Sequence, residues 1–390
     1  SQARHQLWLG RYDDAEQRDR EVYDLAEKAL AKRPGDIRAM RNRYYAAEGL
    51  AIVAMRRHDY ATAARYTARS EQAAEEAVRF NPSDPIPWDL WASGLQQSAI
   101  VSFQRGEVGR AVDQLRAAVA LADDPRAPPA FDQRLFSQWF LLAQLEASSG
   151  QRAAAVRSLD AGIKTGEEAL KLLPEGDVRR VLDLASDTRW RARIMSVLGD
   201  HTVAYELTGA AIRELERLRI DSDDFEGKQA RSTLQSSLAT HIDAAWQLGR
   251  HAEAEAAARR AVALPETSHG GNPPRGKANR QVQLARSIAS QGRGPEAKAE
   301  LARALEYYDS ESKAGATDTL FRLDYAEALY ASALAQGTDP AGRTARQRDL
   351  AEAAELLAGA SAEVQRLSTI RELAGRIAAA AAAVTPARVP

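Results

Sequence analysis

Leu248-Gly249-Arg250-His251-Ala252-Glu253-Ala254 is one of seven versions of a pattern that recurs along this chain of 390 residues. In the pattern, a glycine is followed five residues later by an alanine. The alanines are separated by 43 to 50 residues, and they are Ala15, Ala63, Ala111, Ala155, Ala204, Ala254 and Ala297. Repeats of about 20 to 50 residues are typical of arrays of stacked structural units. The sequence therefore predicts an elongated repeat protein.

The glycine position indicates what each unit is. It holds Gly10, Gly106, Gly150, Gly199, Gly249 and Gly292, with His58 as the one exception. Glycine is favoured where a helix ends and the backbone needs a positive φ. Small residues also recur twelve residues before and seven residues after each alanine, which lets helices pack closely. We therefore expect an all-α, right-handed superhelical α-solenoid of seven to eight antiparallel helical hairpins.

These residues resemble the tetratricopeptide repeat family. Leu9-Gly10-Arg11-Tyr12-Asp13-Asp14-Ala15 is similar to the turn between its two helices, and Ala261-Val262-Ala263-Leu264-Pro265 is similar to the end of its second helix. The resemblance covers residues 1–310 as about seven units. The first unit is expected to be truncated, because only nine residues precede Gly10. The family's usual repeat is about 34 residues, so this array resembles a variant with longer helices.

The register becomes less regular after the seventh unit. We expect a loop from Pro265 to Lys277 before that unit, and an atypical last repeat, a capping helix and a short tail over residues 311–390. The expected helices are Thr319–Leu334, its partner Gln347–Leu357, and a final helix Ala362–Ala383. Atypical terminal units cover the apolar face that an array would otherwise expose.

Composition excludes several classes of function. Lys plus Arg total 53 against 54 for Asp plus Glu, a net charge of −1, so no electrostatic attraction to nucleic acid is expected. The absence of cysteine excludes disulfides, thiolate metal sites and cysteine nucleophiles. No apolar run approaches the length of a membrane helix, so we expect no membrane insertion. The compartment stays open, with the cytoplasm favoured over the periplasm.

No motif in the chain predicts catalysis, a cofactor or a metal. Gly271-Asn272-Pro273-Pro274-Arg275-Gly276-Lys277-Ala278 is close to a phosphate-binding loop. It lacks the final Ser or Thr, and its two prolines remove backbone donors, so we interpret it as part of an inter-repeat loop. The six histidines have no paired spacing for a metal. We therefore expect a protein that is not an enzyme.

The resemblance implies that the first helix of each unit lines a concave groove, which is the usual binding face. The residues placed there are Gln96, Phe103, Phe140, Gln144, Arg189, Arg193, Asp243, Trp246, Asn279 and Arg286. The three arginines with Asn279 would suit a carboxylate or an acidic peptide, because guanidinium groups bind carboxylates bidentately. We nevertheless favour the interpretation that these are ordinary solvated charges of the groove.

The sequence thus favours a non-catalytic domain that binds a protein, a peptide or an adjacent domain of the same protein. In this hypothesis it is the scaffold or sensor module of a larger bacterial signalling or regulatory protein. Two alternatives stay open: a free-standing, chaperone-like assembly adaptor, and a regulatory domain that binds a small-molecule effector. The sequence does not predict the partner or the oligomeric state.

Overall fold

The structure is a computed structural model, and every regular element that it describes is an α-helix or a short 3₁₀-helix. It describes residues 11–171, 173–174, 177–218, 222, 224–265 and 273–384. The chain divides into an N-terminal unit, Ser1–Leu145 with Asp160–Ala169, and a C-terminal unit, Glu146–Leu159 with Leu170–Pro390. The prediction of an all-α chain of repeated helical hairpins is confirmed.

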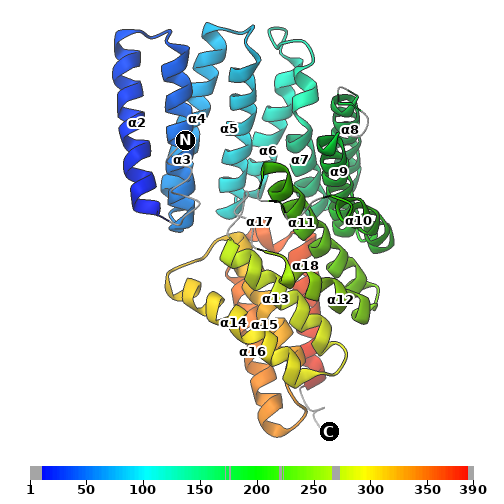
Figure 1. The fold of residues 1–390 in the computed structure, drawn as a ribbon. Helices are drawn as coiled ribbons and strands as arrows, with labels where there is room; N and C mark the ends of the chain where they lie inside the picture. The colour runs from blue at the N-terminus through cyan, green and yellow to red at the C-terminus, as the bar shows by residue number, and fades with distance from the viewer. Residues whose placement is uncertain are drawn as a thin grey trace. The chain divides into compact units, whose positions relative to one another are not determined.

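The N-terminal unit is a row of helices in which each helix from α2 to α6 packs against the next one along the chain (Figure 1). Its elements are α2 (Tyr12–Lys32), α3 (Ile37–Arg56), α4 (Tyr60–Phe80), α5 (Pro85–Gln104), α6 (Val108–Ala120), η1 (Leu121–Asp123), η2 (Phe131–Arg134) and most of α7 (Phe136–Ser148). Trp88 anchors one of its cores. The indole is fully buried against Phe131, and its Nε1–H donates to the carbonyl of Pro82 at 2.9 Å.

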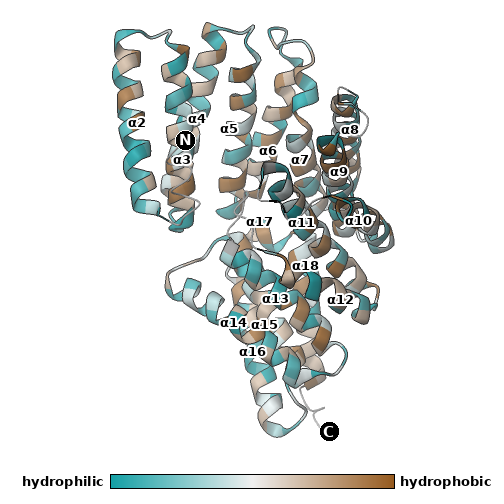
Figure 2. Cartoon of the chain, in the orientation of Figure 1, coloured by the Kyte–Doolittle hydropathy of each residue, from teal (hydrophilic) through white to brown (hydrophobic). Residues whose placement is uncertain are grey.

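The C-terminal unit repeats the same hairpin and ends in a further helix. Its main elements are α9 (Val178–Val197), α10 (His201–Leu215), α11 (Phe225–Gln247), α12 (His251–Ala263), α13 (Pro273–Ala289), α14 (Gly294–Lys313), α15 (Thr319–Ala335), α16 (Pro340–Ala358), α17 (Ala362–Gln365) and α18 (Ser368–Val384). Helix α8 (Arg152–Leu170) contributes residues to both units. Polar and apolar residues alternate around the helices, as expected for packing on one face (Figure 2).

The turn within each hairpin has the backbone that its glycine predicts. Gly106, Gly150, Gly199, Gly249 and Gly292 all have positive φ, between 74° and 87°. His58 adopts the same left-handed conformation at φ 58°, although it carries a side chain. A Cβ added at Gly249 would meet nothing within 4 Å. The requirement for glycine there is therefore conformational rather than steric.

The alanines that define the repeat are among the most deeply buried residues that the structure describes. The side chains of Ala15, Ala63, Ala111, Ala155, Ala204, Ala254 and Ala297 are all 0 % exposed. In one of the cores, Ala192 of α9, Ala204 of α10 and Ala244 of α11 form a single buried cluster. Because the buried residues of this cluster carry only methyl groups, the three helices can approach one another closely there.

Three boundaries differ from the sequence-based expectation. Helix α16 begins at Pro340 rather than at Gln347, because Asp339 caps it by accepting from the N–H of Gly342 at 2.9 Å. The expected final helix is broken into α17 and α18, since Ser368 starts a new helix. Helix α13 begins at Pro273, inside the loop expected over 265–277.

Proline suits the first turn of a helix, where its missing N–H has no intrahelical acceptor to lose. This explains why Pro273 and Pro340 can be the first residues of their helices. Gly271, Asn272 and the helix expected before Gly10 lie outside the described residues. None of the helices that the structure describes carries an apolar segment long enough to cross a membrane.

Replacing Gly249 by alanine tests the conformational role of the repeat glycine. We expect Gly249→Ala to lower the free energy of unfolding by about 1 kcal/mol or more, because alanine is strained at positive φ. Gly375→Ala is the matched control: Gly375 lies inside α18 with nothing within 4 Å of an added Cβ. Alanine should raise stability there by up to about 1 kcal/mol. Urea denaturation of both variants measures the difference, and equal effects would contradict this account of the turn.

Candidate functional site

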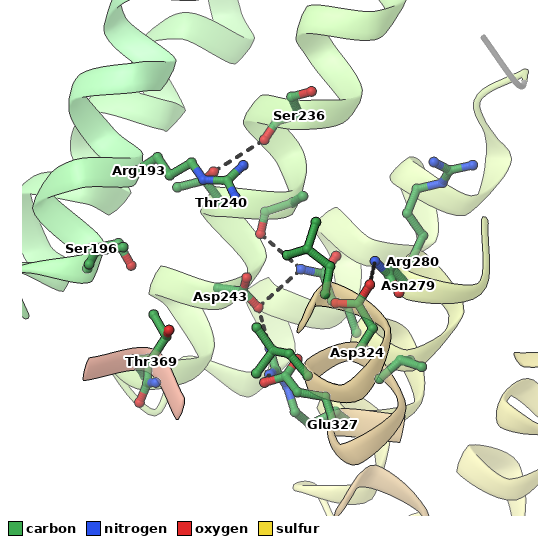
Figure 3. A pocket seen from close by; sticks show the side chains of 18 of the residues that line it. Arg193, Ser196, Ser236, Thr240, Asp243, Asn279, Arg280, Asp324, Glu327 and Thr369 are labelled. Carbon is green, nitrogen blue, oxygen red and sulfur yellow. Dashed lines mark hydrogen bonds and ion pairs between the residues drawn. The ribbon is translucent and has the colours of Figure 1, made fainter. Parts of the chain in front are cut away.

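A cavity of about 510 Å³ lies within the C-terminal unit. Its walls come from α9, α11, α13 and α15, which are the first helices of four successive hairpins, and from α18. Figure 3 shows side chains from these helices directed into the same space. A volume of this size is in the range of pockets that bind small molecules or a few side chains of a peptide.

Five charged side chains of alternating sign follow one another around this cavity. We call them the charge ladder: Arg193 on α9, Asp243 on α11, Arg286 on α13, Glu327 on α15 and Arg376 on α18. The first four occupy the same register position in their helices. Each directly follows a residue that is 0 % exposed, namely Ala192, Ile242, Ala285 and Ala326. The sequence repeat that produces the helical array therefore also places these four charged side chains in the lining of the same cavity.

The middle of the ladder is held by ion pairs. Arg286, only 2 % exposed, reaches Asp243 at 2.5 Å and Glu327 at 3.3 Å. Arg376 reaches the same Glu327 oxygen at 3.2 Å. Burial raises the pKa of the Glu327 carboxyl, and the two guanidinium groups oppose that shift. Removing one member of such a buried network leaves a charge uncompensated, which is costly.

Asp324 on α15 is also occupied by neighbouring side chains. Its Oδ2 accepts from Arg275 Nε at 2.7 Å and from Asn279 Nδ2 at 3.0 Å. Tyr308 donates in turn to the Asn279 amide oxygen. Asn279 therefore lines the cavity as part of a hydrogen-bonded wall.

Arg193 differs from the other members of the ladder. Within the part of the chain that the structure describes, no carboxylate lies within ion-pair distance of its guanidinium group. Asp243 and Asp324 attract it only from further away, while the protein atoms around it lower its pKa by desolvation. The residue nevertheless keeps contact with solvent and is classed as exposed, and Figure 3 shows it directed into the cavity.

Neutral hydrogen-bonding groups line the same cavity as Arg193. They come from Ser196 on α9 and from Ser232, Ser236 and Thr240 on α11. Thr240 and Ser236 are linked by a hydrogen bond from the Thr240 hydroxyl to the Ser236 carbonyl at 3.3 Å. This end of the cavity therefore offers one cation and several groups that can both donate and accept hydrogen bonds.

Four of the ten sequence-predicted site residues line the cavity, and one lies beside it. Those in the lining are Arg193, Asp243, Asn279 and Arg286. Trp246 packs against the ladder: Arg286 lies over its ring at 4.5 Å, Arg376 at 5.1 Å, and its Nε1–H donates to Ser290 at 2.9 Å. Arg286 was expected to be an available or solvated groove cation. Instead, two carboxylates already bind it.

Arg189 is not among the lining residues. Its guanidinium group stacks on Trp190 at 4.5 Å, and burial lowers its pKa to about 10. It lies one turn before Arg193 on α9, but its position in the register is different. The sequence predicted that Arg189 and Arg193 both face the groove. In the structure, the two side chains lie in different environments.

The other four predicted residues belong to the N-terminal unit and take no part in this cavity. Gln96 accepts from the Ser137 hydroxyl at 3.3 Å. Phe103 packs against a core cluster, and Gln144 is half-buried. Phe140 is fully buried, and a Cβ added at Gly162 would meet its ring at 3.2 Å. Phe140 is therefore a core residue rather than a side chain presented to a partner.

Sequence reasoning missed the contribution of the last helix. On α18, Thr369, Glu372 and Arg376 line the cavity, while Ile370, Leu373 and Ile377 are buried. The spacing of three and four residues on both faces was visible in the sequence as a polar stripe beside an apolar one. The helix was assigned to capping from its position in an atypical terminal unit, and its polar face was not considered.

A second cavity, of about 500 Å³, lies between α10, α11 and α12. On its floor the His241 ring stacks on Tyr205 at 4.2 Å, and its Nδ1 lies 2.9 Å from the Thr208 hydroxyl. Tyr205 also donates to Glu253. Burial lowers the pKa of His241, with Arg213 and Arg250 acting in the same direction and Glu253 opposing them. His241 is thus held in its neutral form.

No family model matches this sequence, and no curated protein matches it. Solved structures are similar at the level of the helical array. BtubC (BKLC) from P. vanneervenii is 18% identical, with 64% of this chain and 91% of that chain covered and a TM-score of 0.47. A Rap protein complexed with competence and sporulation factor is 13% identical, with 97% and 96% covered and a TM-score of 0.46. A tetratricopeptide repeat protein from Parabacteroides merdae is 13% identical, with 86% and 98% covered and a TM-score of 0.40.

We expect His241 to make the folded chain less stable as the pH falls. Because burial makes the pKa of His241 lower in the folded chain than its ordinary value of 6.5, the unfolded chain binds a proton first as the pH falls. Its contribution to stability is present above pH 6.5 and is lost as the pH falls through the folded value. Melting temperatures of the wild type and His241→Gln at pH 7.5 and 5.5 test this. The variant should lose less on acidification, and an equal loss in both proteins would contradict the assignment.

Proposed function

We propose that this chain is a non-catalytic binding scaffold whose C-terminal unit receives a peptide segment of a partner protein in the cavity lined by the charge ladder. The segment carries an acidic group that pairs with Arg193. Within this proposal the partner is a separate protein or an adjacent domain of the same protein.

The state of the carboxylates supports binding rather than catalysis. Each acidic side chain in the lining has a partner among the described residues: Asp243 and Glu327 are paired with arginines, Asp324 with Arg275 and Asn279, and Glu372 with Gln247. A general base needs a carboxylate that is free to take a proton from a substrate. These carboxylates instead hold the wall of the cavity together.

The observation that carries the proposal is the unpaired guanidinium group of Arg193. An arginine that has no counter-ion among the described residues gains a charge-assisted hydrogen bond when an anion binds, and such bonds are roughly twice as strong as neutral ones. The hydroxyl groups beside it suit the N–H and C=O groups of a peptide backbone. A carboxylate on a peptide meets both requirements.

Two wider roles fit this chemistry. We favour a sensor or scaffold module of a larger regulatory protein, in which occupancy of the cavity is passed to another domain. A free-standing assembly adaptor would use the same site. A small acidic effector is the second candidate, because α18 closes one side of the cavity and limits its volume to about 510 Å³.

Selection of short peptides tests the proposal without knowledge of the natural partner. Hexapeptides selected on the wild-type chain from a displayed library should be enriched in Asp or Glu. Arg193→Gln should weaken their binding tenfold or more, as expected for loss of a charged hydrogen bond of about 1.5–3 kcal/mol. Isothermal titration calorimetry with Asp and Asn versions of one peptide measures the effect.

Arg191→Gln is the matched control, because Arg191 is an exposed arginine on the same helix but is not among the residues lining the cavity. It should bind the selected peptides as the wild type does. Equal losses in the two variants, or selected peptides without acidic residues, would contradict the role of Arg193. Selection of no peptide, together with binding of small carboxylic acids that depends on Arg193, would favour the effector alternative.

A further inference from the structure

Arg376, the last member of the charge ladder, lies in a slot made by side chains of two other helices. Its guanidinium carbon lies 5.1 Å from the centre of the Trp246 ring and 5.6 Å from the centre of the Tyr330 ring. Its Nη2 reaches Glu327 at 3.2 Å. Trp246 belongs to α11, and the other two residues belong to α15.

The composition of this slot is that of a cation-recognition site. Indole and phenol rings attract a cation through the negative face of their π-systems, and a carboxylate adds a charge-assisted hydrogen bond. Arginine suits the slot better than lysine, because its planar group both stacks and forms directed hydrogen bonds. The slot is filled here by a residue of the same chain.

The fit of Arg376 in the slot is incomplete. Its Nε and Nη1 atoms are buried, and among the described residues they find no acceptor. Buried donors in folded proteins are almost always hydrogen-bonded. A ligand that brings its own carbonyl or carboxylate oxygen, as a peptide does, would supply what the chain does not.

Helix α18 is anchored by side chains other than Arg376. Ile370, Leu373 and Ile377 hold α18 by their buried side chains, on a face that the slot does not use. If another guanidinium group enters as Arg376 leaves, the buried charge, the ion pair to Glu327 and the stacking are all preserved. Such an exchange avoids the main cost of breaking a buried ion pair, which is an uncompensated charge.

We propose that the slot formed by Trp246, Tyr330 and Glu327 binds an arginine side chain of the partner segment, in competition with Arg376. This inference rests on the proposed function and deepens it. The segment then carries an acidic group for Arg193 and an arginine for the opposite end of the charge ladder. Arg376 acts as an internal occupant that keeps the slot closed to weaker cations.

The test uses N-acetyl-arginine methylamide as the probe and the citrulline analogue, which has the same shape but no charge, as its control. The full chain, Arg376→Gln and Arg371→Gln are titrated by calorimetry or ligand-detected NMR. Arg371 is an exposed arginine on the same helix. A tethered group competes at an effective concentration of roughly millimolar. Arg376→Gln should therefore bind the arginine probe at least tenfold more tightly than the other two proteins, and none should bind the citrulline analogue.

Equal affinity of all three proteins for the arginine probe would overturn the proposal. So would unchanged affinity after Trp246→Ala is added to Arg376→Gln, because the probe would then be bound elsewhere. If circular dichroism shows that Arg376→Gln has lost helix, Arg376→Lys replaces it. That variant keeps a cation for Glu327, and it should still bind the probe more tightly than the wild type does.

An Arg193→Gln arm separates this inference from the proposed function. The probe has no anionic group, so Arg193→Gln should leave its affinity unchanged while it weakens the acidic peptides. If only the arginine probe fails to bind as expected, the slot proposal is wrong, and the proposal that Arg193 binds an acidic group is unaffected. If only the acidic peptides fail to bind as expected, the proposed function is wrong.

Discussion

Ala192, Ala204 and Ala244 meet in one buried cluster between α9, α10 and α11, and the charged residues next to two of these alanines line the cavity. Because methyl groups mediate the contact, the helices approach closely and their rotation is fixed. The residue that follows Ala192 is Arg193, and the residue that precedes Ala244 is Asp243. The same packing that stabilises the hairpins therefore directs the charge ladder into the cavity.

The parts of the fold that depend on local chemistry were predictable. A positive φ favours glycine, and a fully buried contact between helices favours alanine. Each of these preferences acts at a single position, so the repeat of Gly249 and Ala254 could be recognised in the sequence. Helix starts were less predictable. The sequence predicted a helix from Gln347, yet the Asp339 cap makes Pro340 the first residue of α16.

The site was only partly predictable, for a physical reason. The register showed which residues face the cavity, and Arg193, Asp243 and Arg286 were found in that way. Pairing across helices depends on distances that spacing does not contain. The sequence therefore did not show that Arg286 is neutralised by Asp243 and Glu327, while Arg193 has no counter-ion among the residues that the structure describes. The contribution of Arg376 was missed because its helix was taken only as a cap.

The chain contains no cysteine, so one introduced thiol can be labelled uniquely. The most direct test of the cavity as the binding face is peptide binding by Thr240→Cys carrying a bulky maleimide label, compared with labelled Ala252→Cys. Thr240 lines the cavity, whereas Ala252 is exposed on α12. The account predicts that the label at position 240 abolishes binding of the selected acidic peptides and that the label at position 252 has no effect. Undiminished binding with the cavity blocked would contradict it.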